Sequence, residues 1–329
     1  GYTRQVGDMY YESIMSSTAP NRVSWFSGTI NPPKGSKVNG TNKHMGGPTL
    51  DNRDSVGCER TDSGKPFSCV PLRWKTVPEY LQEAGISWRV YQDKDNFGDD
   101  PLVMWKQYQT SAKKKGDLAQ RGTSFPGLQK FFDDARDGKL PEVSYIVAPM
   151  QLSEHPPYMP MDGAWIQGEV AKAVMHGKNW DSTALIYSYD ETGGWADHVV
   201  SPYPPQSEES EWIEDPYDKS NGITPIGPGF RLPFYIVSPW TSGGHVFTEH
   251  AAHESQIMFL EQWALAHGKP FTSEEIPTWR REQLSDLVKA FEFSSKDTSV
   301  PEVTHVRKPS QDIFTVPFNG ADDCQAFDG

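Results

Sequence analysis

Apolar residues follow two different spacings along the chain, and each spacing predicts a different element. Apolar residues three or four positions apart indicate amphipathic helices, and such stretches cover residues 76–84, 127–137, 165–176 and 255–267. Short continuous apolar runs rich in β-branched and aromatic residues indicate buried strands, and these cover residues 87–91, 143–148, 183–189 and 234–238. Strands that alternate with helices in this way predict an α/β fold, in which helices flank a central, mostly parallel sheet.

The predicted elements divide the chain into two parts. All of them fall within residues 1–293, which we interpret as one domain. Residues 294–329 show neither spacing, so we expect an irregular C-terminal extension packed on that domain. No run of about 18 apolar residues occurs in the sequence, which therefore predicts no transmembrane segment.

The excess of acidic over basic residues restricts the kind of partner that the protein can bind. The chain has 329 residues, with 44 acidic against 31 basic side chains and a formal net charge of −13. A protein that binds nucleic acid needs a basic face to neutralise the phosphates, so we expect no nucleic-acid partner. Self-repulsion of this kind keeps acidic secreted proteins in solution.

Three cysteines and one glycosylation motif favour an extracellular location. Cys58 and Cys69 lie eleven positions apart in a stretch rich in Gly, Ser and Pro, where a short loop can close as a disulfide. Cys324 has no evident partner. Asn39 begins an Asn-Gly-Thr sequon, which accepts N-linked glycans in secreted proteins. We therefore predict a secreted glycoprotein with a Cys58–Cys69 disulfide.

An acidic pair directly follows one of the predicted strands. Residues 183–189 run into Asp190 and Glu191, and Gly193 and Gly194 then allow a tight turn. Ligands gather at the carboxyl ends of strands in open α/β sheets, and two carboxylates there suit a divalent cation such as Mg, Ca, Mn or Zn. A solvated acidic turn explains the same residues without a metal, so both interpretations stay open at this point.

A hydroxyl-rich segment near the N-terminus offers a nucleophile. Ser17 and Thr18 precede Asn21 and Arg22, so a hydroxyl lies close in sequence to a cation that can hold phosphate oxygens. Ser, Thr and Asn are also the residues that favour helix N-caps and turns. The residues alone therefore leave a catalytic and a purely structural role open.

Three histidines are candidates for proton transfer or for structural roles. His155 precedes two prolines, which stiffen the loop and can fix an imidazole for proton donation to a leaving group. His198 follows the acidic turn, and His253 opens a predicted helix, where a buried polar partner is the commoner use. The sequence contains no GxSxG motif, P-loop or HExxH zinc motif.

Eight segments occur in an order that is found in one known family. They are Thr18–Arg22, Phe26–Thr29, Gly46–Asn52, Glu154–Pro157, Asp190–Val199, Gly227–Pro233, Ser238–Gly244, and Trp279–Arg281 with Asp286–Leu287. Taken together, they resemble the phosphoesterase family of secreted phospholipases C and related acid phosphatases, and several motifs look most like those of fungal members. The resemblance covers nearly the whole chain, and its strength lies in the order because each motif alone is weak.

The resemblance implies a fold and a mechanism. The family has an alkaline-phosphatase-like layered α/β fold. Its members attack a phosphoester with a metal-activated Ser or Thr and form a covalent phospho-enzyme. This role falls on Thr18, or on Ser17 if the register slips by one. Asp190 and Glu191 become metal ligands, and His155 stabilises or protonates the leaving oxygen.

The remaining motif residues receive less defined roles. The resemblance places Asn21 and Arg22 near the nucleophile, where Arg22 could equally be structural. His198 and His253 belong to family motifs without a defined role. The implied substrate is a phospholipid or a small phosphoester. A phosphatidylcholine-type phospholipase C, an acid phosphatase of broad monoester specificity and a non-catalytic secreted binding protein of the same fold all stay open.

One departure from the family pattern concerns the N-terminal region. Family members usually carry a Glu-Asn-Arg-Ser-type motif on their first strand, where it supplies further metal ligands. No Glu-Asn pair precedes Thr18 in this chain. We therefore expect that the family's N-terminal segment is absent from the printed sequence, either because the sequence is incomplete or because a cleaved piece stays bound. That segment could also hold the partner of Cys324.

Overall fold

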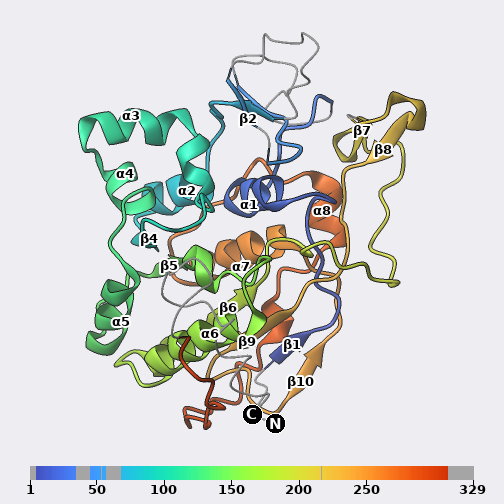
Figure 1. The fold of residues 1–329 in the computed structure, drawn as a ribbon. Helices are drawn as coiled ribbons and strands as arrows, with labels where there is room; N and C mark the ends of the chain where they lie inside the picture. Colours follow the sequence, from blue (N-terminus) through green and yellow to red (C-terminus); the bar gives the residue numbers. More distant parts are fainter. Residues whose placement is uncertain (1–4, 35–44, 53, 57–67, 216, 310–329) are drawn as a thin grey trace, which may run out of the picture.

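The computed structural model describes residues 5–34, 45–52, 54–56, 68–215 and 217–309 (Figure 1). The α-helices are α1 Thr18–Ser27, α2 Val77–Glu83, α3 Lys106–Lys114, α4 Asp117–Gly122, α5 Leu128–Asp137, α6 Pro160–Met175, α7 His253–Ala266 and α8 Thr278–Gln283. The strands are β1 Gln5–Gly7, β2 Asp54–Val56, β3 Ser68–Val70, β4 Trp88–Tyr91, β5 Val143–Ile146, β6 Leu185–Ser188, β7 Trp212–Glu214, β8 Ile223–Pro225, β9 Phe234–Val237 and β10 His245–Phe247.

All eight elements predicted from the apolar spacing are present. The predicted strands correspond to β4, β5, β6 and β9, and the predicted helices correspond to α2, α5, α6 and α7. Helix α6 begins at Pro160, five residues before the predicted start. Proline favours the first turn of a helix because its φ angle is already helical and its missing N–H would be unpaired there. The alternation of strands and helices thus gives the mixed α/β fold that the sequence predicts.

The prediction of a mostly parallel sheet is wrong for the four-stranded sheet. Its strand order is β10-β1-β9-β6, and β9 pairs antiparallel with both β1 and β6, whereas β1 and β10 are parallel. The sheet is therefore mixed. A short apolar run indicates that a strand is buried on both faces, but it contains no information about the direction in which the strand is paired.

The other strands form three separate pairs. Strands β4 and β5 are parallel, as are β2 and β3, whereas β7 and β8 are antiparallel. Helix α6 connects β5 to β6, so the chain passes from the β4–β5 pair to the four-stranded sheet through one crossover (Figure 1).

Helices cover both faces of β5 and β6. On one face Phe131 of α5 and Val170 of α6 belong to a buried cluster, against which Ile146 and Leu185 pack. On the other face Ile257 of α7 belongs to a cluster that includes residues of α1, β4 and β5. Burying one large aliphatic or aromatic side chain contributes about 1.5–3 kcal/mol, so these two layers fix the strand ends that carry the polar residues described below.

A buried charge network joins the C-terminal helices to the core. Arg280 of α8 lies between Glu211 and Glu254, at 2.8 Å from an oxygen of each. Glu254 also accepts hydrogen bonds of 2.6 Å from Ser13 and Ser24. The network therefore ties α8 and α7 to α1, where the candidate nucleophile lies.

Residues 294–309 contain no helix or strand and contact the rest of the fold at several points. The Trp180 indole N–H donates to the Thr298 carbonyl at 3.0 Å, and the Asp297 N–H donates to the Pro239 carbonyl at 2.8 Å. The division into a domain at 1–293 and an extension at 294–329 stays a prediction.

Some predictions fall outside the described residues. They concern the sequon at Asn39, the Cys58–Cys69 disulfide and the partner of Cys324; for Cys69 the backbone of β3 is described but the side chain is not. Within the part of the chain that the structure describes, no helix has the length and apolar composition needed to cross a bilayer.

Candidate active site

Arg22 joins the start of α1 to the end of β6. Its Nε donates to Asp190 Oδ2 at 2.8 Å, and its Nη2 lies 3.0 Å from Asp99 Oδ2. Burial by itself would raise the pKa of Asp190, but the charge and hydrogen bond of Arg22 hold that pKa below its usual value. The Arg22 guanidinium and an ionised Asp190 are therefore fixed beside each other, although 168 positions separate them in the sequence.

The turn that leads into α1 is held by amide side chains. Asn21 is fully buried, and its side chain accepts from the Ile14 N–H and donates to the Ile14 carbonyl, both at 2.9 Å. Asn52 accepts from the Ala19 N–H at 2.7 Å. Asn21 thus acts on the backbone of the turn, which fixes the position of Thr18.

Thr18 and Ser17 differ in accessibility at this turn. Ser17 Oγ is buried, and no described group bonds to it. Thr18 is the first residue of α1 and is half-buried, and its hydroxyl makes no hydrogen bond to a described residue. The N-terminus of a helix carries a partial positive charge, which favours a phosphate group. In the first turn of α1 the Ala19 N–H is bonded to Asn52 and Pro20 has no N–H, so the helix acts there through its dipole. Thr18 is therefore the better placed of the two hydroxyls for attack on a phosphoester.

Glu191 and Glu12 form an acidic pair next to Asp190. Burial raises the pKa of Glu191, and the charge of Asp190 adds to this shift. Burial raises the pKa of Glu12 to about 8, and the charges of Glu191 and Asp190 contribute. Glu12 Oε1 accepts from the Phe230 N–H at 3.1 Å, whereas Oε2 is buried without a well-formed hydrogen bond. Glu12 was not predicted, and an acidic residue directly after two buried tyrosines is the signal that could have indicated it.

These carboxylates offer part of a donor set for a divalent cation. Oxygen donors suit Mg, Ca and Mn, and Zn also accepts them. The buried, poorly bonded oxygen of Glu12 is the kind of group that a cation would satisfy. However, the described residues contain no group of three or more His, Cys, Asp or Glu side chains placed to hold a metal. Asp190 and Glu191 would therefore supply only part of a coordination shell.

His253 lies behind Asp190 and is almost fully buried. Its Nε2 lies 2.8 Å from the Asp190 carbonyl, and its Nδ1 lies 2.9 Å from the Tyr10 hydroxyl. Burial lowers the pKa of His253, so the ring is neutral at pH 7. A carbonyl only accepts, so Nε2 carries the proton and Nδ1 accepts from Tyr10. His253 thus has the buried polar partners that we expected from its position at the start of a helix, and its hydrogen bond positions the Asp190 backbone.

His155 and His198 are both exposed, but only His155 faces the site. The His155 ring packs edge-on against Phe97, two residues before Asp99, at 5.1 Å between ring centroids, and a positive charge on it would lower the pKa values of Asp99 and Glu191. Its Nδ1 lies 2.8 Å from the Pro156 carbonyl. The side chain of His198 is 98% exposed, and its Nδ1 lies 3.9 Å from the neighbouring Asp197 carboxylate. His198 is therefore not among the residues that the structure brings together around Asp190.

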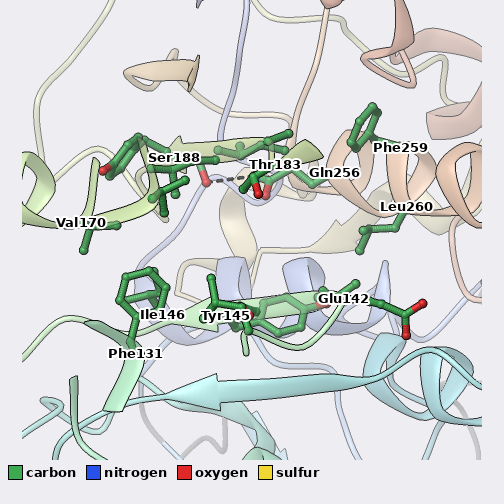
Figure 2. A pocket seen from close by; sticks show the side chains of 18 of the residues that line it. Phe131, Glu142, Tyr145, Ile146, Val170, Thr183, Ser188, Gln256, Phe259 and Leu260 are labelled. Carbon is green, nitrogen blue, oxygen red and sulfur yellow. Dashed lines mark hydrogen bonds between the residues drawn. The ribbon is translucent and has the colours of Figure 1, made fainter. Parts of the chain in front are cut away.

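A cavity of about 1150 Å³ adjoins the site. Strands β5 and β6 line its two sides, and Arg22, Asp99, Asp190 and His253 lie at its polar end. Figure 2 shows side chains of β5, among them Tyr145 and Ile146, and residues of the β6 segment on opposite sides of an open band.

Comparisons with known proteins agree with the motifs. Residues 3–265 match the Phosphoesterase family. The chain is 33% identical over 328 residues to a non-hemolytic phospholipase C of Burkholderia pseudomallei, an alignment that covers 90% of this chain and 43% of that protein. It is 36% identical over 304 residues to a non-hemolytic phospholipase C of Pseudomonas aeruginosa, covering 88% and 40%.

A third relative is phospholipase C B of Mycobacterium tuberculosis, at 31% identity over 319 residues, covering 93% of this chain and 56% of the relative. The alignments thus span between 40% and 56% of the length of these three curated relatives. All three are bacterial, so the particular likeness to fungal members stays a prediction.

Proposed function

The chain belongs to the phosphoesterase family, and from this we propose that it is a phosphoric ester hydrolase that cleaves phospholipids in the manner of a phospholipase C. The observation that carries the proposal is the position of Thr18 at the N-terminus of α1, one turn before Arg22, which is bound to Asp190. A hydroxyl, a guanidinium and a helix N-terminus at one place are what in-line attack on a phosphoester requires.

Each residue has a defined task in the proposed reaction. Arg22 holds the non-bridging phosphate oxygens, and the positive end of the α1 dipole favours the phosphate. The ionised Thr18 Oγ1 attacks phosphorus and forms a phospho-threonine, while the bond to the glycerol oxygen breaks. His155 donates a proton to that oxygen, which releases diacylglycerol. Neutral His155 then accepts a proton from water, whose oxygen attacks phosphorus. The bond between phosphorus and Thr18 Oγ1 breaks, which releases the phosphorylated head group and returns Thr18 to its ionised form.

We also propose that activity depends on a divalent cation, of which Ca, Mg, Mn and Zn are the candidates. Asp190 and Glu191 would hold it, and when bound it would favour the ionised form of the Thr18 hydroxyl. The raised pKa values of Glu191 and Glu12 support a site that gains from an added positive charge.

The proposal also includes a more specific type of fold and an extracellular location. We propose an alkaline-phosphatase-like arrangement, which is supported by Asp190 after β6 and by Asp99 in the loop that follows β4. We propose secretion, which the Asn39 sequon and the cysteine pair Cys58 and Cys69 support. A shift in mass on removal of N-glycans from protein produced in a secretory host tests it, and an unglycosylated product would count against it.

Nucleophile variants test the mechanism. Thr18→Ser keeps a hydroxyl and should retain measurable hydrolysis of phosphatidylcholine, whereas Thr18→Val should lose at least about 10³-fold in kcat because the covalent step is removed. Thr224→Val in β8 is the matched control, since it makes the same change on a half-exposed strand away from the site. Full activity of folded Thr18→Val would refute the assignment, and Ser17→Ala would then identify the neighbouring hydroxyl.

A further inference from the structure

Glu154, the residue directly before His155, has a backbone conformation that its residue type does not favour. Its φ angle is +65°, in the left-handed region that suits glycine. A longer side chain is strained in this region, and the conformation persists only where the surrounding structure determines it. The strain here lies next to the residue to which proton donation is assigned, so we asked which contacts hold Glu154 in place.

The carboxylate of Glu154 is held from two different elements. Its Oε2 accepts from the Tyr189 hydroxyl at 2.5 Å, and its Oε1 accepts from the side-chain amide of Gln167 at 2.8 Å. The same amide donates to the Tyr189 hydroxyl at 3.1 Å, which closes a ring of three side chains. Gln167 belongs to α6, and Tyr189 lies between the end of β6 and Asp190. The ring therefore ties Glu154 to the strand that leads into Asp190.

Helix α6 has a glycine at the place where the Glu154 side chain passes it. A Cβ atom at Gly163 would overlap Cγ and Oε1 of Glu154, so any other residue would displace the carboxylate. Glycine inside a helix lowers the stability of that helix relative to alanine. Gly163 thus permits a close approach of Glu154 to α6 at the expense of helix propensity, which is a second local sacrifice at the same contact.

The loop after Glu154 fixes the orientation of the His155 imidazole. The His155 N–H donates to Ser153 Oγ at 3.1 Å, and His155 Nδ1 lies 2.8 Å from the Pro156 carbonyl. Because a carbonyl only accepts, Nδ1 carries a proton, and Nε2 is the atom left to exchange a proton with the leaving oxygen. The ring edge also packs on Phe97, at 5.1 Å between centroids. The direction of Nε2 therefore depends on the backbone that Glu154 sets.

We propose that Glu154 is a positioning residue for His155, and that its carboxylate, held by Tyr189 and Gln167, keeps His155 Nε2 directed at the leaving oxygen. The inference rests on the proposed phosphoester hydrolysis. Glu154 takes no part in the proton transfer and acts through His155. The alternative is that the three side chains only stabilise the loop, in which case their loss would lower the rate with every substrate alike.

Two soluble substrates with different leaving groups separate these interpretations. The glycerol oxygen of a short-chain phosphatidylcholine needs a proton in order to leave, whereas p-nitrophenolate leaves p-nitrophenylphosphorylcholine without one. Glu154→Gly accepts the left-handed backbone but removes the carboxylate. It should lower kcat/KM for the phosphatidylcholine by about tenfold or more and kcat/KM for the nitrophenyl ester by less than about threefold. We compare kcat/KM because it reports the step in which the leaving group departs.

Two tyrosine variants provide a second test and its matched control. Tyr189→Phe removes one hydrogen bond to Glu154 and should change the ratio of the two kcat/KM values in the same direction. Tyr91→Phe removes a bond of the same kind, from a tyrosine hydroxyl to the Asp134 carboxylate at 2.8 Å, between β4 and α5. It should leave the ratio unchanged. Thermal melting shows whether each variant is folded.

A double variant and a spectroscopic measurement complete the experiment. In a His155→Gln background, Glu154→Gly should change kcat/KM for the phosphatidylcholine by less than about twofold, because a positioning residue acts only through the ring. NMR of protein labelled with ¹⁵N-histidine, with the His155 signal assigned by His155→Gln, should show the Nδ1-protonated ring in the wild type and both tautomers in Glu154→Gly. The NMR result needs no activity, so a chain that hydrolyses neither substrate would refute the proposed function and still test the role of Glu154.

Three results would overturn the proposal. The first is an equal loss of kcat/KM with both substrates in Glu154→Gly. The second is a loss of the same size in the presence and absence of the His155 imidazole. The third is a His155 tautomer that is the same in the wild type and in Glu154→Gly.

Discussion

The most informative perturbation is the removal of the Arg22 side chain. Arg22 pairs with Asp190 and Asp99 at 2.8 and 3.0 Å, and the three side chains are 17%, 24% and 11% exposed. Breaking a fully buried pair costs about 3–5 kcal/mol, and breaking an exposed one costs about 0–1 kcal/mol. The exposure here lies between these cases, so Arg22→Ala should lower the free energy of unfolding by about 2 kcal/mol.

The catalytic effect of Arg22→Ala should exceed its effect on stability. If the guanidinium holds the phosphate oxygens as charge develops, its loss should lower kcat/KM for phosphatidylcholine by about 10²–10³-fold, which corresponds to about 3–4 kcal/mol. Arg22→Lys keeps the charge but loses the planar pair of donors, so it should recover only part of the rate.

The assay combines urea unfolding with steady-state kinetics under conditions in which every variant is folded. Arg121→Ala is the control, because Arg121 pairs with Asp117 at 3.9 Å on the surface of α4 and its loss should change neither quantity measurably. A folded Arg22→Ala enzyme with kcat/KM within about threefold of the wild type would refute the assignment of Arg22 to the phosphate.

Three further predictions concern other parts of the molecule. Arg280→Ala should destabilise the fold by about 3–5 kcal/mol in urea unfolding because it leaves two buried carboxylates unpaired, and a loss below 1 kcal/mol would contradict this account of the network. Asp134 accepts from Tyr91 and Lys130; burial opposes its ionisation, yet the Lys130 and Tyr91 hydrogen bonds hold its pKa below the ordinary value. The ionised Asp134 therefore stabilises the fold at a pH above the pKa that this carboxyl has in the unfolded chain, and the stabilisation is lost as the pH falls through its pKa in the folded protein. Asp134→Asn should lower the free energy of unfolding by about 1 kcal/mol at pH 7 and leave it unchanged at the acid end. A loss of stability that is independent of pH would contradict this. His155→Gln should lower kcat by about 10²-fold or more, whereas His198→Gln should leave it unchanged, and equal losses would remove the distinction between the two histidines.

The strands and the longer helices could be predicted because their apolar residues determine both burial and periodicity. Val143–Ile146 and Leu185–Ser188 are examples of strands found from composition alone. The direction of β9 could not be predicted, since Phe234–Val237 has the same apolar character whichever way it pairs. Helix α3 was missed because Tyr108 is its only buried residue, which leaves no apolar stripe to detect.

The candidate site could be predicted as a set of residues but not as an arrangement. Asp190 and Arg22 were each noted from local sequence, yet nothing local indicates that they pair across 168 positions. Asp99 and Glu12 were missed because a single acidic residue in a loop or after a strand is common, and only the fold brings these two to the others. The different roles of two histidines likewise depend on tertiary contacts. His155 lies on the side of the carboxylates, whereas His253 is bonded to the Asp190 carbonyl and supports that backbone.

The central claim is tested most directly by incubating the chain with phosphatidylcholine in the presence of each candidate divalent cation and after chelation, and by identifying the products. The account predicts diacylglycerol and phosphocholine in equal amounts, formed with at least one cation and lost on chelation. Hydrolysis of small phosphomonoesters alone would instead indicate a phosphatase. No product from either class of ester by folded protein with cations restored would contradict the proposed activity of this chain.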